Sequence, residues 1–94
     1  MDRVNLDIFD MIKFRVITVI NESGMKLPQL EELTGISRYT WSNLKNPAKN
    51  REIKEEEITA IGNAFPEYRW WIFTGEEMPE VGQISPMTKN AKQS

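Results

Sequence analysis

Four side chains in the middle of the chain have the types and the spacing that base recognition in duplex DNA requires. They are Arg38, Tyr39, Ser42 and Asn43, which fall on one face of a predicted helix. An arginine can donate two hydrogen bonds to O6 and N7 of guanine, and an asparagine can pair similarly with adenine. A tyrosine can pack on thymine methyl groups or bond a phosphate, and a serine makes weaker contacts. The alternative for each residue is an ordinary solvated side chain. The predicted elements that position the four residues therefore decide between the two interpretations.

The element predicted to present this face is a helix-turn-helix over residues 27–44. Its first helix is predicted at Leu27–Thr34, with Pro28 in the first turn, where a missing N–H does no harm. Gly35 ends this helix, because glycine easily adopts the left-handed backbone of a tight turn. The chain can then turn sharply into a second helix.

That second helix is predicted from Arg38 to about Lys45 and would be the recognition helix. Ser37 is a good N-cap for it, and Asn46-Pro47 ends it. The apolar side chains predicted to fix the angle between the two helices are Leu30, Ile36, Trp41 and Leu44. With these four inward, the base-reading candidates project from the opposite side, where a helix fits the major groove.

Three further helices are predicted around the motif, at residues 4–23, 53–64 and 66–74. The first is the longest apolar segment, closed by Gly24. Its β-branched run at 16–20 could form a strand by propensity, but the preceding helical periodicity and the lack of a hairpin partner favour a helix. Residues 77–94 are polar and proline-punctuated, which predicts an extended or disordered tail. The predicted fold is all-α, a compact five-helix DNA-binding domain over residues 1–76.

The charge of the chain is polarised along its length. The net charge is −2, which by itself does not suit a DNA-binding protein, since neutralising phosphates supplies much of the affinity. Residues 37–54 carry a net charge of +4, with Glu52 as their one acid, whereas residues 55–94 carry −4. The positive segment coincides with the predicted recognition helix and the loop after it.

Composition argues against several function classes. The chain has no cysteine and no histidine, so disulfides, zinc-finger sites and the usual general base are excluded. The acidic run Glu55-Glu56-Glu57 lacks convergent partners and is predicted to be a solvated helix N-terminus, not a metal or acid/base site. We therefore expect no enzyme activity, cofactor, metal or small-molecule ligand. No segment has the length of a membrane span or the pattern of a signal peptide, and a cytoplasmic location in a bacterial host is expected.

The sequence resembles the Cro/lambda-repressor family of helix-turn-helix regulators. Leu30 to Ser37, with the sequence Leu-Glu-Glu-Leu-Thr-Gly-Ile-Ser, resembles the second helix and turn of that family. Residues 64–76 look like its closing helix, and the resemblance covers about residues 25–76. It implies a sequence-specific regulator of duplex DNA, most simply a small phage or prophage repressor. Such a protein would bind an inverted-repeat operator as a homodimer.

The resemblance also assigns roles to individual residues. The base-contacting positions of the family match Arg38, Tyr39, Ser42 and Asn43. The phosphate-contacting candidates are Lys26, Leu27, Ser37, Thr40, Lys45, Asn46, Lys49 and Arg51. Three residues depart from the family pattern. Glu31 replaces the usual alanine, Trp41 replaces a smaller aliphatic residue and requires compensation in the core, and Leu27 leaves only a backbone amide for a phosphate.

Two tryptophans near the end of the predicted domain suggest a further surface. Trp70 and Trp71 are adjacent on one helix and cannot face the same way, which argues against a joint stacking platform for single-stranded nucleic acid. Trp71 is predicted to join the core, and Trp70 with Phe73 is a candidate dimer surface. A rival interpretation is a protein-interaction module, antitoxin-like or an inhibitor of a host protein, which would use the apolar first helix.

Overall fold

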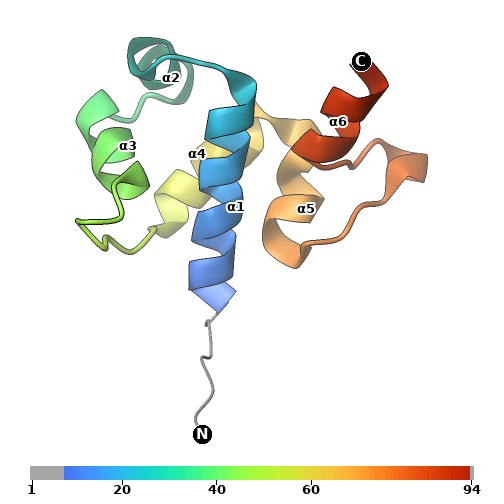
Figure 1. Cartoon of the computed structure of the whole chain (residues 1–94), viewed down its shortest axis with the longest axis horizontal. Helices are drawn as coiled ribbons and strands as arrows, with labels where there is room; N and C mark the ends of the chain where they lie inside the picture. Colours follow the sequence, from blue (N-terminus) through green and yellow to red (C-terminus); the bar gives the residue numbers. More distant parts are fainter. Residues whose placement is uncertain (1–7, 94) are drawn as a thin grey trace, which may run out of the picture.

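The computed structural model describes residues 8–93, which form helices joined by short loops (Figure 1). In chain order the elements are α1 Ile8–Ser23, α2 Leu27–Thr34, α3 Arg38–Lys45, α4 Glu55–Ala64, the 3-10 turn η1 Pro66–Tyr68, α5 Arg69–Thr74, the 3-10 turn η2 Pro79–Val81 and α6 Pro86–Gln93. Within residues 8–93, extended pairing is limited to one antiparallel bridge between Met78 and Gln83. The all-α prediction is confirmed, with six helices in this part of the chain in place of five.

The long first helix forms because its apolar residues follow helical spacing, and the β-branched run within it is helical. Ile12, Val16, Val19 and Ile20 are buried along one side of α1. Tertiary burial of this face outweighs the strand propensity of the run. The predicted helix began at residue 4, and its residues 4–7 lie outside the described part of the chain.

α1 and α4 form the centre of the molecule and separate two groups of elements (Figure 1). α2 packs on α3 and on α4, whereas α5 packs on α1 and α4, and α6 packs on α1. We call α2, α3 and the loop up to residue 54 the motif half, and residues 66–93 the C-terminal half. One continuous core joins them, with Leu30 and Trp41 from the first group and Trp71 and Ile72 from the second.

Two predicted helices have different bounds in the structure. α4 begins at Glu55, not at residue 53, because Lys54 has an extended backbone and is the N-cap of the helix, and Ile53 is buried in the loop before it. The predicted helix at 66–74 is divided into η1 and α5 at Arg69. Pro66 stands at the first position of the 3-10 turn, where its missing N–H costs nothing.

The predicted extended or disordered tail is wrong for residues 77–93, and only Ser94 lies outside the described residues. Ser85 and Pro86 are buried, and α6 follows them directly. Ser85 Oγ accepts the N–H of Thr88 at 3.2 Å, as an N-cap does, and proline occupies the first helical position. The Glu77 carboxylate accepts the Ser85 N–H at 2.6 Å. The prediction relied on the polar composition of this segment. It failed because the segment is held in place by specific hydrogen bonds more than by apolar burial.

Candidate nucleic-acid interface

The two helices of the motif have the bounds that the sequence predicts. Gly35 ends α2 with φ of 75°, the left-handed conformation expected there, and its N–H donates to Glu31 O at 2.8 Å. Ser37 caps α3, since its Oγ accepts the Tyr39 N–H at 3.1 Å. At the start of α2, the Gln29 side chain accepts the Lys26 N–H at 2.9 Å. Local hydrogen bonds therefore define both ends of α2 and the start of α3.

Trp41 anchors α3 against α2 and is compensated by a threonine that sequence reasoning did not single out. The Trp41 side chain is fully buried, together with Leu30 and Leu44. Its indole N–H donates to Thr34 Oγ1 at 3.1 Å. Thr34 Oγ1 also accepts the Ile36 N–H at 3.2 Å, which ties the turn to the end of α2. A hydroxyl seven residues before the tryptophan was the available signal, because a buried indole N–H needs an acceptor.

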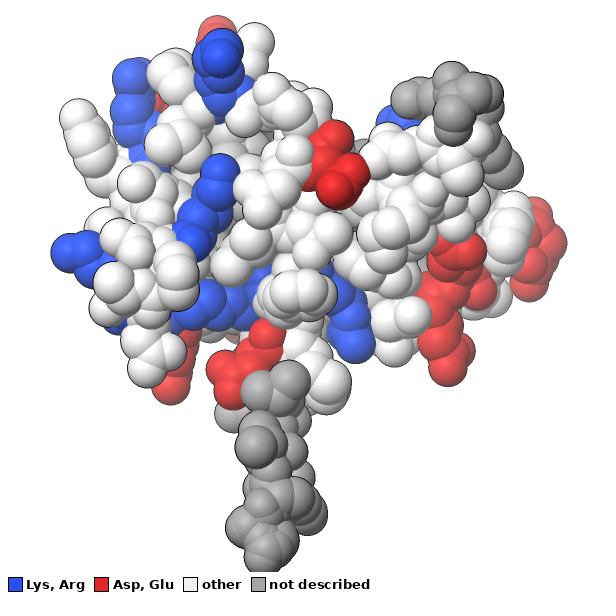
Figure 2. All heavy atoms as spheres, viewed as in Figure 1, with Lys and Arg blue, Asp and Glu red and all other residues white. Residues whose placement is uncertain are grey.

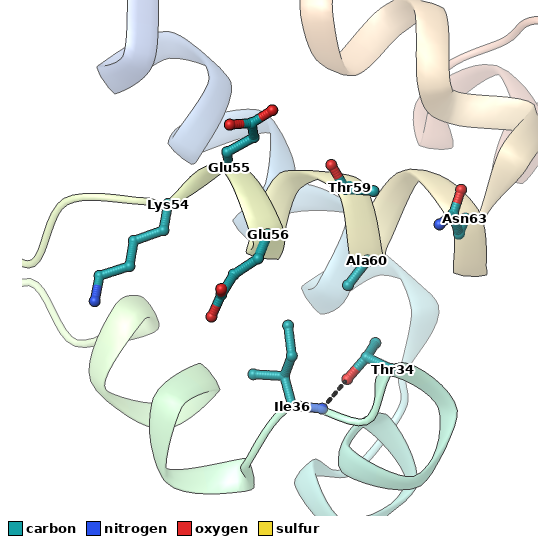
Figure 3. Close-up of a pocket in the computed structure, with 8 residues that line it drawn as sticks. All are labelled: Thr34, Ile36, Lys54, Glu55, Glu56, Thr59, Ala60 and Asn63. Carbon is teal, nitrogen blue, oxygen red and sulfur yellow. Dashed lines mark hydrogen bonds between the residues drawn. The ribbon is translucent and has the colours of Figure 1, made fainter.

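A polar cleft lies behind this turn, between Thr34 and Ile36 on one side and α4 on the other. Figure 3 shows Glu56 and Ala60 of α4 pointing toward Ile36 of the turn, whereas Glu55 and Thr59, at the rim of the cleft, point away from it. No base-reading or phosphate-contacting candidate lines it. The cleft therefore belongs to the back of the motif.

The four base-reading candidates are all exposed on α3. Trp41 and Leu44 occupy the buried side of the helix, whereas Arg38, Tyr39, Ser42 and Asn43 lie in solvent. The Tyr39 side chain is 74% exposed. A tyrosine with so little protein contact contributes little to folding, which is consistent with a surface kept for another molecule.

Arg38 is held by Glu31 of α2. Its Nε donates to Glu31 Oε1 at 2.8 Å, and its Nη2 lies 2.7 Å from the same oxygen. The Arg38 backbone N–H donates to Glu31 Oε2 at 3.3 Å. The Arg38 side chain, together with its backbone N–H, holds the pKa of Glu31 below its ordinary value. The residue that departs from the family pattern thus contacts the leading base-reading candidate.

The phosphate-contacting candidates surround this face with different exposures. Those exposed to solvent are Lys26, Ser37, Asn46 and Lys49, and those partly buried are Leu27, Thr40 and Lys45. Asn46 Oδ1 accepts the Ala48 N–H at 3.0 Å and so shapes the loop after α3. The same loop contains Asn50 in a left-handed conformation with φ of 48°. Asparagine tolerates that conformation better than most residues.

The eighth candidate, Arg51, points inward. Its Nη1 and Nη2 donate to the two carboxylate oxygens of Glu57, at 3.0 and 2.5 Å. Glu57 is only 1% exposed, so the prediction of a solvated Glu55-Glu56-Glu57 run is wrong for Glu57 and right for the other two. Arg51 O also accepts a hydrogen bond from Lys13 Nζ of α1. The ion pair between Arg51 and Glu57 therefore connects the loop after α3 to the core.

The environment of Glu57 explains how a carboxylate is tolerated there. Burial alone would raise its pKa, but the hydrogen bonds from Arg51 and from the Lys54 N–H outweigh burial and leave the pKa below its ordinary value. The Lys54 N–H donates to Glu57 Oε1 at 2.9 Å, the reciprocal half of a capping box at the start of α4. The pKa of Arg51 is raised in turn by its hydrogen bonds to Glu57.

Charge divides the surface as the sequence suggests. On the face drawn in Figure 2, Lys and Arg side chains predominate over the motif half, on the left, and acidic side chains over the C-terminal half, on the right, with a few acidic side chains also at the lower left and lower centre. The acidic residues of the second group include Glu76 and Glu80, both exposed. A polyanion approaching this molecule would be attracted to the motif half.

The candidate dimer surface is an apolar groove on the C-terminal half. Trp70 and Phe73 are 42% and 48% exposed, while Trp71 is buried as predicted, together with Tyr68 and Ile72. The remaining apolar residues of the groove are Met78 and Val81, which sequence reasoning placed in a tail. The Gln83 side chain fixes this segment by accepting the Trp70 N–H at 2.8 Å and donating to Pro66 O at 2.9 Å.

Other kinds of site are not evident in the described residues. Residues 8–93 contain no group of three carboxylates that could hold a metal ion. None of the helices in this range combines the length and apolarity that crossing a bilayer requires. The exposed helix face and its basic surroundings remain the principal candidate site.

The chain is similar to a solved protein structure over most of its length. Pf6r from the filamentous phage Pf6 of Pseudomonas aeruginosa PA01 matches with a TM-score of 0.71 and 34% sequence identity. The match covers 81% of this chain and 95% of Pf6r. No family model and no curated protein matches the chain. The likeness therefore extends well beyond residues 27–44.

Proposed function

Because the chain belongs to the same family as Pf6r of the filamentous phage Pf6, we propose that it is a non-enzymatic phage regulatory protein that binds double-stranded DNA. In this proposal α3 enters the major groove, and the protein represses transcription by occupying a promoter. The partner is an operator in the cytoplasm of the bacterial host.

The observation that carries the proposal is the outward face of α3. Arg38, Tyr39, Ser42 and Asn43 are exposed together, on a helix whose other side is anchored by the buried Trp41. A helix fixed in this way presents polar side chains to a groove without having to rearrange. Arg38 would contact guanine and Asn43 adenine, with Tyr39 and Ser42 in supporting contacts.

Phosphate contacts on either side would fix the register of α3. Lys26 and the Leu27 amide stand at the start of α2, while Lys45 ends α3, and Asn46 and Lys49 lie in the loop after it. Ser37 and Thr40 lie between these groups. Arg51 supports the loop through Glu57 and would act on phosphate affinity indirectly. Such contacts supply affinity and orientation but no sequence choice.

A dimer follows from the same proposal, with the groove at Trp70 and Phe73 as its surface. The groove is almost wholly apolar, and Met78 and Val81 extend it. Two copies would place their α3 helices in successive major grooves, about 34 Å apart, on an inverted repeat. Sedimentation of wild type and Phe73→Asp would test this, because an added charge opposes apolar association. An unchanged sedimentation coefficient would contradict the role of this surface.

The test of DNA binding begins with selection of duplexes from a random-sequence pool by the intact protein. Binding of a selected duplex and of random DNA is then measured by fluorescence anisotropy at two salt concentrations. We expect tight, salt-sensitive binding to the selected duplex, weakened by Arg38→Ala but hardly by Lys89→Ala, a charge-matched change on α6. Selection that enriches no sequence, with equal binding to all duplexes, would overturn sequence-specific recognition.

A second candidate function is supported by the outer face of α1. Phe14 is 70% exposed, and Ile8 and Phe9 are more than half exposed. Phe14 and Ile17 line a groove that continues to Leu44 and Pro47. Exposed apolar side chains of this kind suit a protein partner. The test is Phe14→Ser, assayed for repression in the host and for DNA binding. If the variant loses repression but keeps DNA binding, a protein interaction through α1 is the main function.

A further inference from the structure

The contact between Glu31 and Arg38 bears on how the proposed DNA recognition achieves specificity. Glu31 lies in the second half of α2, and Arg38 begins α3 across the tight turn. Their side chains are 35% and 44% exposed, respectively, so DNA seated on α3 would reach both. The contact bridges the two helices of the motif at the edge of its exposed face.

The geometry decides which edge of the guanidinium is occupied. Glu31 Oε1 takes the side edge of the guanidinium, formed by Nε and Nη2. An arginine has five N–H donors in a rigid plane, so the outer edge formed by Nη1 and Nη2 retains two parallel donors. Two parallel donors match the paired O6 and N7 acceptors of guanine.

The carboxylate also limits the motion of the arginine. A free arginine samples many rotamers and would have to be ordered on binding. Here the guanidinium is tied to α2, and the second carboxylate oxygen accepts the Arg38 backbone N–H. The same carboxylate therefore orders both the start of α3 and the side chain that projects from it.

The ordering of Arg38 favours binding to guanine, whereas the negative charge of Glu31 weakens binding to DNA that offers no guanine. A carboxylate at the interface repels phosphates, and its pairing with Arg38 reduces the general attraction of that arginine for the DNA backbone. The carboxylate thus opposes every complex, and only a complex in which Arg38 meets guanine recovers the loss.

We infer that Glu31 is a specificity-determining residue that positions Arg38 for a guanine contact and penalises DNA lacking that guanine. This inference rests on the proposed function, and a second acidic residue of α2 provides its control. Glu32 is exposed on the same helix, and its side chain has no hydrogen bond or ion pair in the described structure. Glu31→Gln and Glu32→Gln remove the same charge from neighbouring positions.

The experiment compares wild type with these two variants on a duplex selected by the wild-type protein, on versions substituted at each guanine, and on random DNA. We expect Glu31→Gln to bind random DNA about three- to tenfold more tightly, and to lose about fivefold or more of its discrimination at one guanine. Glu32→Gln should tighten binding to all duplexes alike and keep the discrimination. The amide oxygen introduced by Glu31→Gln can still accept the Arg38 N–H, so thermal unfolding should show little change.

Two outcomes would overturn the inference. If Glu31→Gln behaves as Glu32→Gln does, Glu31 contributes only its charge. If Glu31→Gln reduces guanine discrimination equally in an Arg38→Ala background, its effect does not pass through Arg38. A wild-type protein that selects no sequence would instead refute the proposed function, and the two failures are therefore distinguishable.

Discussion

The motif half and the C-terminal half pack on the same two central helices but present opposite surfaces. The first buries one tryptophan completely and exposes polar side chains among basic residues. The second buries Trp71, exposes Trp70 beside an apolar groove, and is surrounded by acidic residues. In the proposed function, this difference corresponds to a division of labour in which one half meets a polyanion and the other meets a protein surface. Substitutions in each half should therefore affect different measurements.

The largest expected effect is the loss of stability in Trp41→Ala. The variant removes a fully buried indole and one of the two N–H groups that donate to Thr34 Oγ1, the other being that of Ile36. We expect the free energy of unfolding to fall by about 3–5 kcal/mol, as measured by urea denaturation. Trp70→Ala, at a half-exposed position, should cost about 1 kcal/mol or less. Equal costs for the two tryptophans would contradict the asymmetry between the halves.

Arg51→Ala should have the next largest effect on stability, because it leaves the buried carboxylate of Glu57 without its charged partner. We expect a loss of about 2–3 kcal/mol in unfolding free energy, less than for a fully buried pair because Arg51 remains partly exposed. Urea denaturation at neutral pH would measure this loss. A loss below about 0.5 kcal/mol, alongside a reduced salt dependence of DNA binding, would return Arg51 to the phosphate contacts.

The same ion pair predicts a pH dependence whose sign follows from the lowered pKa of Glu57. A carboxyl whose pKa is lower in the folded state stabilises the fold above its unfolded pKa of about 4.3. That contribution is lost as pH falls through the folded pKa. Unfolding free energy should therefore decline below about pH 4.5. Glu57→Gln should flatten this decline, whereas Glu56→Gln, exposed on the same helix, should leave it largely unchanged.

Arg38→Ala should affect DNA binding more than stability, whereas Arg51→Ala should affect stability more than DNA binding. Its ion pair is partly exposed on both sides, so stability should change by less than about 1 kcal/mol. Affinity for a selected duplex should fall by about 1–3 kcal/mol, and preference at one base pair should relax. Anisotropy titrations on duplexes substituted at single positions would measure both. An equal loss on selected and random DNA would show that Arg38 contacts phosphate only.

Ser85→Ala tests the C-terminal half with a smaller change. Ser85 caps α6 through its hydrogen bond with the Thr88 N–H and is itself buried. We expect a loss of about 1 kcal/mol in unfolding free energy, a typical cost for removing a serine cap. DNA binding at a fixed temperature well below unfolding should not change. An unchanged stability would indicate that the Ser85 cap does not contribute to the stability of the fold.

The contrast between the halves also shows where sequence reasoning succeeds. α2 and α3 were predicted at their observed bounds because glycine, serine and apolar spacing act locally and agree with one another. In the C-terminal half the prediction failed at residues 77–93, where hydrogen bonds join residues distant in sequence. Gln83 bonds the Trp70 N–H, and Asn90 Nδ2 bonds Glu22 Oε1 of α1. Only the adjacent serine and proline at 85 and 86 offered a local signal, and they fit a helix start.

The candidate site was predictable in its exposed positions but not in its ion pairs. Exposure of Tyr39 and its neighbours follows from the burial of Trp41 and Leu44 on the other side of one short helix. Three adjacent glutamates look alike in sequence, yet only Glu57 faces inward to Arg51. The inward turn of Arg51 depends on the path of the loop after α3, which has no periodic pattern to predict it.

Lys49→Ala is expected to have the smallest effect and tests whether the motif half meets a polyanion as a whole. Lys49 is exposed on the loop after α3, and its side chain has no hydrogen bond or ion pair in the described structure. Its removal should weaken binding to every duplex alike and reduce the slope of log K against log salt by about 0.9, the value for one lost phosphate contact. Lys89→Ala, the same charge change on α6, should leave that slope unchanged. If both variants flatten the slope equally, the effect is one of net charge, and the DNA-facing role could not be assigned to the motif half.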